Sequence, residues 1–191
     1  FEDSPPAATR AIHPPAPLLR QTGRATPTTT WCTLTATHTS LRYLALGDSY
    51  TCGEGVAPAE RWPEQLASRL RSGSLDLAEV RIVARTGWTT QELAAGIEQA
   101  ALQPPYDLVS LQIGVNNQYR GQPPELYRTS LRALLAHARE LAGGRAGRVL
   151  VPSIPDWGHT PHARQQQRDP TQVARELDAR SEEHTSELQS L

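Results

Sequence analysis

The pattern of apolar and polar positions divides the chain into parts of different character. Residues 1–40 hold six prolines and a threonine-rich run, and their apolar residues follow neither the period of a strand nor that of a helix. This composition is typical of chain that does not pack a core. We expect residues 1–40 to be a disordered tail or a non-native upstream segment, with a short ordered linker as the alternative.

From Leu41 onward, short apolar runs alternate with amphipathic segments. The pattern predicts helices over 62–70, 89–100 and 123–141, a further helix that opens near Pro170, and strands over 43–46, 81–84, 108–113 and 149–151. Thr89 and Glu92 have the spacing of a helix capping box. Alternating strands and helices with short connections favour a parallel sheet covered by helices on both faces. We therefore predict one α/β domain with three layers, α/β/α, over residues 41–179.

Composition and charge exclude several classes of function. The formal net charge is -1 and no basic run occurs, so nothing favours nucleic acid or an anionic membrane surface as a partner, and a small neutral substrate fits better. Cys32 and Cys52 form neither a CxxC motif nor a cysteine and histidine cluster, and no metal site is expected. No apolar run approaches the roughly 20 residues of a membrane span, and no signal-peptide pattern occurs near residue 1. Compartment and oligomeric state stay open.

Groups suited to acyl transfer follow each predicted strand. In open parallel sheets the functional site lies beyond the carboxyl ends of the strands. The segments at these four places are GDSYTCGEGV, RTGWTT, GVNNQYRG and PSIPDWGHTPHA. Ser49 is placed to act as a nucleophile beside unpaired N–H groups of a loop that turns into a helix. Gly87 can offer a second N–H, and Asn116 a side-chain amide, so the three residues could hold a tetrahedral oxyanion.

With these motifs over residues 41–179, the chain resembles the SGNH (GDSL-like) hydrolase family. The resemblance implies a flavodoxin-like parallel sheet and hydrolysis of esters or thioesters through an acyl-enzyme, without metal or cofactor. Ser49, Gly87 and Asn116 match the family's serine, glycine and asparagine, and are the predicted catalytic residues. Asn117 stands where the family usually has aspartate, a change expected to affect loop support. We place Asp48, Asn117 and Asp156 at the substrate-binding side of the site, with Asp48 holding its loop by hydrogen bonds; a small-molecule ester is the expected partner.

The general base is the missing part of the pattern. The resemblance implies a final DxxH motif that supplies an aspartate and a histidine from an element after the fourth strand and its loop, and no DxxH follows that loop in this sequence. His159 and His162 follow the fourth predicted strand, and one of them could substitute as the base, although a loop histidine is more often solvated. As a metal pair they lack an evident third ligand. Tyr119 and Trp157 are interpreted as residues of a substrate loop, with plain loop packing as the alternative.

The end of the chain suggests a reason for the missing motif. Residues 180–190, RSEEHTSELQS, are recognisable as one reading frame of a widely used sequencing adapter. We therefore expect residues 180–191 to be adapter translation, the domain over 41–179 to be truncated and the sheet to be incomplete at its C-terminal side. The parent protein would then be an ester hydrolase, and this fragment would be nearly inactive.

Two other functions remain as hypotheses. A ligand-binding module could retain the hydrolase fold without its chemistry, and its natural C-terminus would then also lack DxxH. A phosphate-binding α/β protein could use the glycine-rich loop after the first strand. The loop GDSYTCGEG lacks the GK[ST] ending of a P-loop, however, which argues against phosphate binding.

Overall fold

The structure is a computed structural model that describes residues 40–189, with side chains described as far as Arg180. The segment expected to be disordered or non-native, residues 1–40, lies outside this range except for Ser40. Both that expectation and the assignment of residues 180–191 to an adapter stay predictions.

A four-stranded parallel sheet forms the centre of the described domain. Its strands are β1 (Leu41–Gly47), β2 (Leu77–Ala84), β3 (Leu108–Gln112) and β4 (Val149–Leu150), in the spatial order β2-β1-β3-β4. All three pairings are parallel, and Leu46 in β1 lies between Val83 in β2 and Leu111 in β3. The predicted α/β class with a parallel sheet is confirmed.

Seven α-helices connect and extend these strands in the described part of the chain. They are α1 (Ser49–Cys52), α2 (Trp62–Ser72), α3 (Thr90–Gln99), α4 (Val115–Tyr119), α5 (Pro124–Leu141), α6 (Pro161–Gln165) and α7 (Pro170–Gln189), with short 3-10 turns at Pro58–Glu60 and Ala146–Arg148. The predicted capping box is present. Thr89 caps α3, and a Glu92 carboxylate oxygen accepts from the Thr89 backbone N–H at 2.8 Å.

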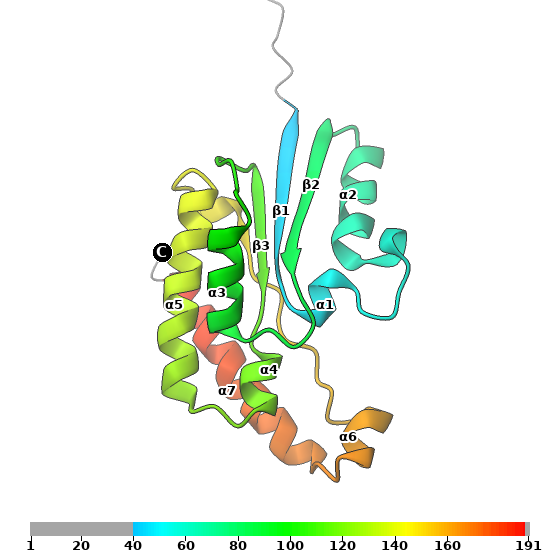
Figure 1. Ribbon diagram of the computed structural model, residues 1–191, viewed down its shortest axis with the longest axis vertical. Helices are drawn as coiled ribbons and strands as arrows, with labels where there is room; N and C mark the ends of the chain where they lie inside the picture. The colour runs from blue at the N-terminus through cyan, green and yellow to red at the C-terminus, as the bar shows by residue number, and fades with distance from the viewer. Residues whose placement is uncertain (1–39, 190–191) are drawn as a thin grey trace, which may run out of the picture. The chain divides into compact units, whose positions relative to one another are not determined.

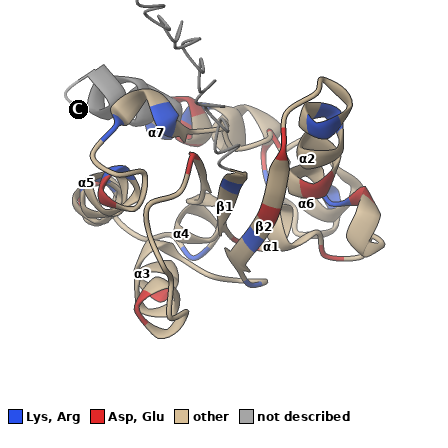
Figure 2. Ribbon diagram, turned by 90° about the horizontal axis from the view of Figure 1, so that it is seen from above, with Lys and Arg blue, Asp and Glu red and all other residues tan. Residues whose placement is uncertain are grey.

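Helices cover both faces of the sheet because β1 is apolar on both sides. Leu44 and Leu46 are fully buried in a core shared with α3 and α5. Tyr43 and Ala45, which alternate with them, are fully buried in a second core against α2. Figures 1 and 2 show α2 on one side of the sheet and α3 and α5 on the other. A continuous apolar run is the pattern expected for a strand buried on both faces.

A third apolar cluster lies beyond the carboxyl ends of the strands. It joins the start of α4 to the loop after β4, to α6 and to α7, through Val115, Ile154, Trp157, Ala163, Val173 and Leu177. Figure 1 shows α4, α6 and the start of α7 gathered at this end of the domain. The cluster therefore anchors the loops from which a site at this edge would be built.

Several element boundaries differ from the sequence prediction. β2 begins at Leu77, four residues before the predicted start. Its early part includes Glu79, which pairs with Arg42 of the neighbouring strand β1 at 2.6 Å. The short helices α4 and α6 were expected to be loops. β4 has only two residues and ends before Pro152, which cannot donate to a strand ladder.

Acidic and basic residues are interspersed along the ribbon in Figure 2. Among the helices that the structure describes, none has the length and apolarity required to cross a membrane.

Candidate active site

Ser49 is the first residue of α1, directly after β1. Asp48 caps this short helix, and its Oδ1 accepts from the Tyr50 backbone N–H at 3.1 Å. Gly47, the last residue of β1, has to be a glycine, because a Cβ at this position would lie 2.6 Å from the Gln112 carbonyl oxygen of β3. β1 and β3 thus approach closely at their carboxyl ends, and Ser49, two residues after Gly47, lies at this edge of the sheet.

Asp48 is buried beneath this turn, with 1% of its surface exposed. Burial raises the pKa of its carboxyl to about 6, while the hydrogen bond from Tyr50 N–H acts in the opposite direction. The carboxylate thus supports the loop that carries Ser49, as the sequence analysis expected of its hydrogen bonding.

Gly87 lies in the loop between β2 and α3. Its φ of +82° is in the left-handed region, which favours glycine, and a Cβ there would meet only Arg120 Nη2, at 3.8 Å. Glycine is therefore required at this position by backbone conformation more than by space. Its carbonyl oxygen accepts from Arg120 Nη2 at 2.6 Å.

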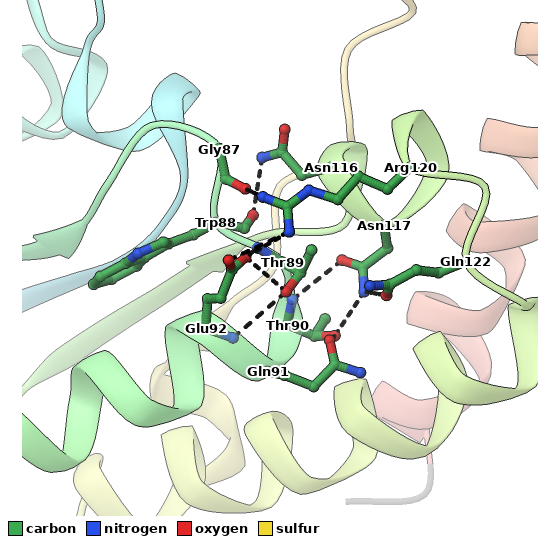
Figure 3. A network of polar contacts seen from close by, with 10 residues as sticks. All are labelled: Gly87, Trp88, Thr89, Thr90, Gln91, Glu92, Asn116, Asn117, Arg120 and Gln122. Atoms are coloured by element: carbon green, nitrogen blue, oxygen red, sulfur yellow. Dashed lines mark hydrogen bonds and ion pairs between the residues drawn. The ribbon is translucent and has the colours of Figure 1, made fainter.

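Asn116 lies in the first turn of α4, after β3. Its Nδ2 donates to the Trp88 carbonyl oxygen at 2.9 Å, which ties α4 to the loop that contains Gly87 (Figure 3). A side-chain amide carries two N–H donors, so one bond to Trp88 leaves the second hydrogen for a ligand. Asn116 can therefore support the loop and donate into the site at the same time.

Asn117 has a different environment from its neighbour. It is fully buried, its Oδ1 accepts from the Thr90 N–H at 3.1 Å, and its Nδ2 donates to Thr90 Oγ1 at 2.8 Å and to Gln122 Oε1 at 2.9 Å. Figure 3 shows the side chain between α4 and the N-terminus of α3. An amide suits this position because it accepts and donates there.

One pocket of about 460 Å³ brings the three predicted catalytic residues together. Ser49, Gly87 and Asn116, which follow three different strands, all line it. The wall also includes four aromatic side chains: Tyr50, Tyr119, Trp157 and His162. The arrangement places a serine hydroxyl, a side-chain amide and aromatic side chains around one cavity, and acyl transfer can use all three kinds of group.

None of the three predicted substrate-binding residues, Asp48, Asn117 and Asp156, lines the pocket. Asp48 is beneath α1 and Asn117 is between α4 and α3. Asp156 accepts from the Gly158 N–H at 2.8 Å within the turn after β4, and its other oxygen is 3.9 Å from His159 Nε2. Substrate binding by these residues stays a prediction.

The two candidate histidines have different environments in the structure. His162 lines the pocket from α6, whereas His159 is exposed beside Asp156. Over the described residues, no group of three or more histidine, cysteine or acidic side chains is placed to hold a metal ion.

Arg120 is a site residue that the sequence analysis missed. Besides Gly87, it contacts Glu92, with its Nη1 3.2 Å from the Glu92 Oε2 that completes the capping box of α3. The sequence feature that could have identified Arg120 is its spacing. It follows Asn116 by four residues, about one helical turn, and lies at the C-terminal cap of α4. Tyr50, Thr86 and Thr160 in the pocket wall were also missed.

Known proteins with similar structures share this fold. TesA is 20% identical, with a TM-score of 0.59 over 78% of this chain and 73% of that chain. The esterase AlinE4 of the SGNH-hydrolase family is 24% identical, with a TM-score of 0.52 over 73% of each chain. A lipase/acylhydrolase from Enterococcus faecalis is 19% identical, with a TM-score of 0.56 over 77% and 72%. At these identities the likeness shows the fold.

Sequence comparison gives a consistent result. An arylesterase from Vibrio mimicus is 26% identical over 128 residues, which are 67% of this chain and 63% of that protein, so the chain spans less than two thirds of that relative's length. The model of the GDSL-like Lipase/Acylhydrolase family matches residues 45–189. The match includes the three strand ends that build the pocket and more than half of the chain, and the chain therefore belongs to the GDSL-like lipase/acylhydrolase family.

Proposed function

We propose that this chain carries the nucleophile and the oxyanion site of a carboxylic ester or thioester hydrolase. The observation that carries the proposal is the single pocket lined by Ser49, Gly87 and Asn116. Membership of an acylhydrolase family, and the likeness to a protein named as an arylesterase, support ester chemistry at this pocket.

The reaction would proceed in two steps. Ser49 Oγ attacks the ester carbonyl carbon, and the Ser49 proton passes to a base. The negative oxygen of the tetrahedral intermediate accepts from the N–H groups of Ser49 and Gly87 and from Asn116 Nδ2. The carbon–oxygen bond to the alcohol then breaks, the alcohol leaves with a proton, and water releases the acid from the acyl-enzyme in the same way.

The base determines how fast this chain can work. A complete triad uses a histidine held by a carboxylate. Asp156 and His159 have the DxxH spacing, but His159 is exposed, its Nε2 lies 3.9 Å from Asp156 Oδ2, and neither residue lines the pocket that contains Ser49. We therefore expect slow hydrolysis by the chain itself. An oxyanion site without a working triad leaves an acceleration of about 10³ to 10⁴ over water.

The position of Asp156 and His159 outside the pocket lining also supports a second candidate function. Without a triad at Ser49 the same pocket could bind an acyl or sugar ligand without turnover. Such a module would bind ligand but show no hydrolysis that depends on the Ser49 hydroxyl, whereas a hydrolase would lose its turnover with Ser49→Ala.

The test compares hydrolysis of 4-nitrophenyl acetate by the chain, by Ser49→Ala and by Ser130→Ala. Ser130 is a half-buried serine of α5 outside the pocket lining, its hydroxyl donates to the Leu126 carbonyl oxygen, and it serves as the matched control. We expect Ser49→Ala to remove the rate above background and Ser130→Ala to retain it. Added imidazole can replace an absent base, so it should raise the rate only in chains with Ser49.

Equal rates for Ser49→Ala and the unchanged chain, with and without imidazole, would overturn the proposed nucleophile. If both chains then bound acyl ligands equally, the binding module would be the better explanation.

A further inference from the structure

Three aromatic rings from separate segments form one side of the pocket. The ring centroid of Tyr119 lies 5.7 Å from that of Trp157 and 6.0 Å from that of His162, and the third pair, Trp157 and His162, is 6.2 Å apart. The planes of Tyr119 and His162 meet at 29°, and the other two pairs at 58° and 51°. Tyr119 ends α4, Trp157 follows β4 and His162 lies in α6, so the fold assembles this aromatic wall from three places.

The indole of Trp157 holds the wall in position. Its side chain is buried with 6% exposed, and Nε1 donates to Gln118 Oε1 at 3.0 Å. Gln118 is itself buried and donates to Glu176 Oε2 at 2.9 Å on α7. The Arg168 guanidinium lies 5.7 Å from the indole centroid. A ring held on so many sides is already ordered before a ligand binds, which lowers the entropic cost of binding.

Tyr119 and His162, in contrast, are exposed to the pocket. Tyr119 has 43% of its surface exposed, and His162 is also exposed. Both line the cavity that contains Ser49. Exposed aromatic faces beside a nucleophile are a surface that a flat apolar group can cover, with a gain from removal of apolar area from water.

We propose that Tyr119, Trp157 and His162 form a subsite that holds an aromatic ring of the ester beside Ser49. An aromatic ring is favoured over a saturated ring of equal size, because rings at centroid distances of 4.5–7 Å gain stabilisation beyond their buried area. The expected advantage is about two- to tenfold in affinity. The position of this subsite relative to the reacting ester rests on the proposed function of Ser49.

In this subsite His162 contributes the face of its aromatic ring and not its ring nitrogens. Phenylalanine keeps an aromatic face of similar size and removes both nitrogens, whereas alanine removes the face. His162→Phe should therefore retain the preference for an aromatic ligand, and His162→Ala should lose it.

The test measures equilibrium binding, so it does not depend on turnover. Two methyl ketones that resemble esters but cannot be hydrolysed, benzyl methyl ketone and its cyclohexylmethyl counterpart, are titrated into the chain and followed by NMR. We expect the benzyl ketone to bind about two- to tenfold more tightly. Tyr119→Leu should abolish this difference and leave the cyclohexyl affinity within about twofold. Leu75→Ala, which changes an exposed apolar residue outside the pocket, should retain the difference.

Equal binding of the two ketones to the unchanged chain would overturn the subsite. So would a preference that survives both Tyr119→Leu and His162→Ala. Thermal unfolding of each variant shows whether the domain is still folded, and His162→Ala, with His162→Phe as its control, provides a second measurement if Tyr119→Leu unfolds it. Ser49→Ala should bind both ketones as before. Ring selectivity without Ser49-dependent hydrolysis would thus reject the proposed function alone, and hydrolysis without ring selectivity would reject the subsite alone.

Discussion

Arg120 Nη2 donates to the carbonyl oxygen of Gly87 at 2.6 Å, and this contact connects the end of α4 to the loop that offers the Gly87 N–H. Arg120 also contacts Glu92 at the start of α3, so one guanidinium joins the two sides of the loop (Figure 3). This hydrogen bond holds the carbonyl group of Gly87, whose φ is +82°. It thereby restricts the directions of the neighbouring backbone N–H groups.

Arg120→Ala should lower kcat for ester hydrolysis by about tenfold with little change in KM, because misplaced oxyanion donors weaken transition-state binding. Steady-state kinetics with 4-nitrophenyl acetate measure the split, and added guanidinium ion should restore part of the rate. Arg128→Ala is the matched control, since Arg128 pairs with exposed Glu125 on α5. A KM effect alone, or equal losses in both variants, would contradict a positioning role for Arg120.

Gly114→Ala should destabilise the domain by about 2 kcal/mol or more. Gly114 has a φ of +129°, and a Cβ there would lie 2.6 Å from Cε2 of the fully buried Tyr127, so conformational strain and overpacking add together. Gly121→Ala is the control, because its φ is +65° but nothing lies within 4 Å of its added Cβ. It should cost only about 1 kcal/mol. Urea unfolding of the two variants measures the difference, and equal losses would remove the steric part of the explanation.

Asp48 should make the stability depend on pH. Burial raises the pKa of its carboxyl from 3.8 to about 6, so the folded state binds the proton more tightly than the unfolded state does. The resulting contribution to stability is complete below pH 3.8 and is lost as the pH rises through about 6. Asp48→Asn keeps an acceptor for Tyr50 N–H and removes the titration.

Unfolding free energies at pH 4, 5, 6 and 7 test this expectation. The unchanged chain should lose stability relative to Asp48→Asn over this range, whereas Glu98→Gln, a change at an exposed carboxylate of α3, should follow the unchanged chain. A constant difference between the chain and Asp48→Asn from pH 4 to pH 7 would show that the carboxyl does not titrate in this window.

Leu131→Ala should cost about 2–5 kcal/mol, because Leu131 is fully buried in the core between α5 and the sheet and its removal leaves a cavity. Leu126→Ala on the same helix should change the stability by less than about 0.5 kcal/mol, since Leu126 is 46% exposed. Chemical unfolding provides both values. Similar losses of stability in the two variants would show that Leu131 does not lie on the core-facing side of α5.

Several features of this protein were determined by the sequence alone. The apolar run Tyr43–Leu46 predicted a strand, and Thr89 with Glu92 predicted the start of a helix, because both signals act between neighbours in the chain. The motifs at the strand ends predicted the family, which the family match confirms. The carboxyl ends of parallel strands share one edge of the sheet, so their order predicted that Ser49, Gly87 and Asn116 would lie together, and one pocket contains all three.

Other features were decided only by the tertiary structure, because they depend on contacts between residues far apart in the chain. Neighbouring asparagines have different environments, since Asn117 is buried against Thr90 while Asn116 lines the pocket. Arg120 reaches Gly87 across 33 positions. The ring contacts among Tyr119, Trp157 and His162 exist because three separate segments converge beyond β3 and β4. Local pattern carries no information on such contacts, since packing at the sheet edge selects which side chains face the pocket.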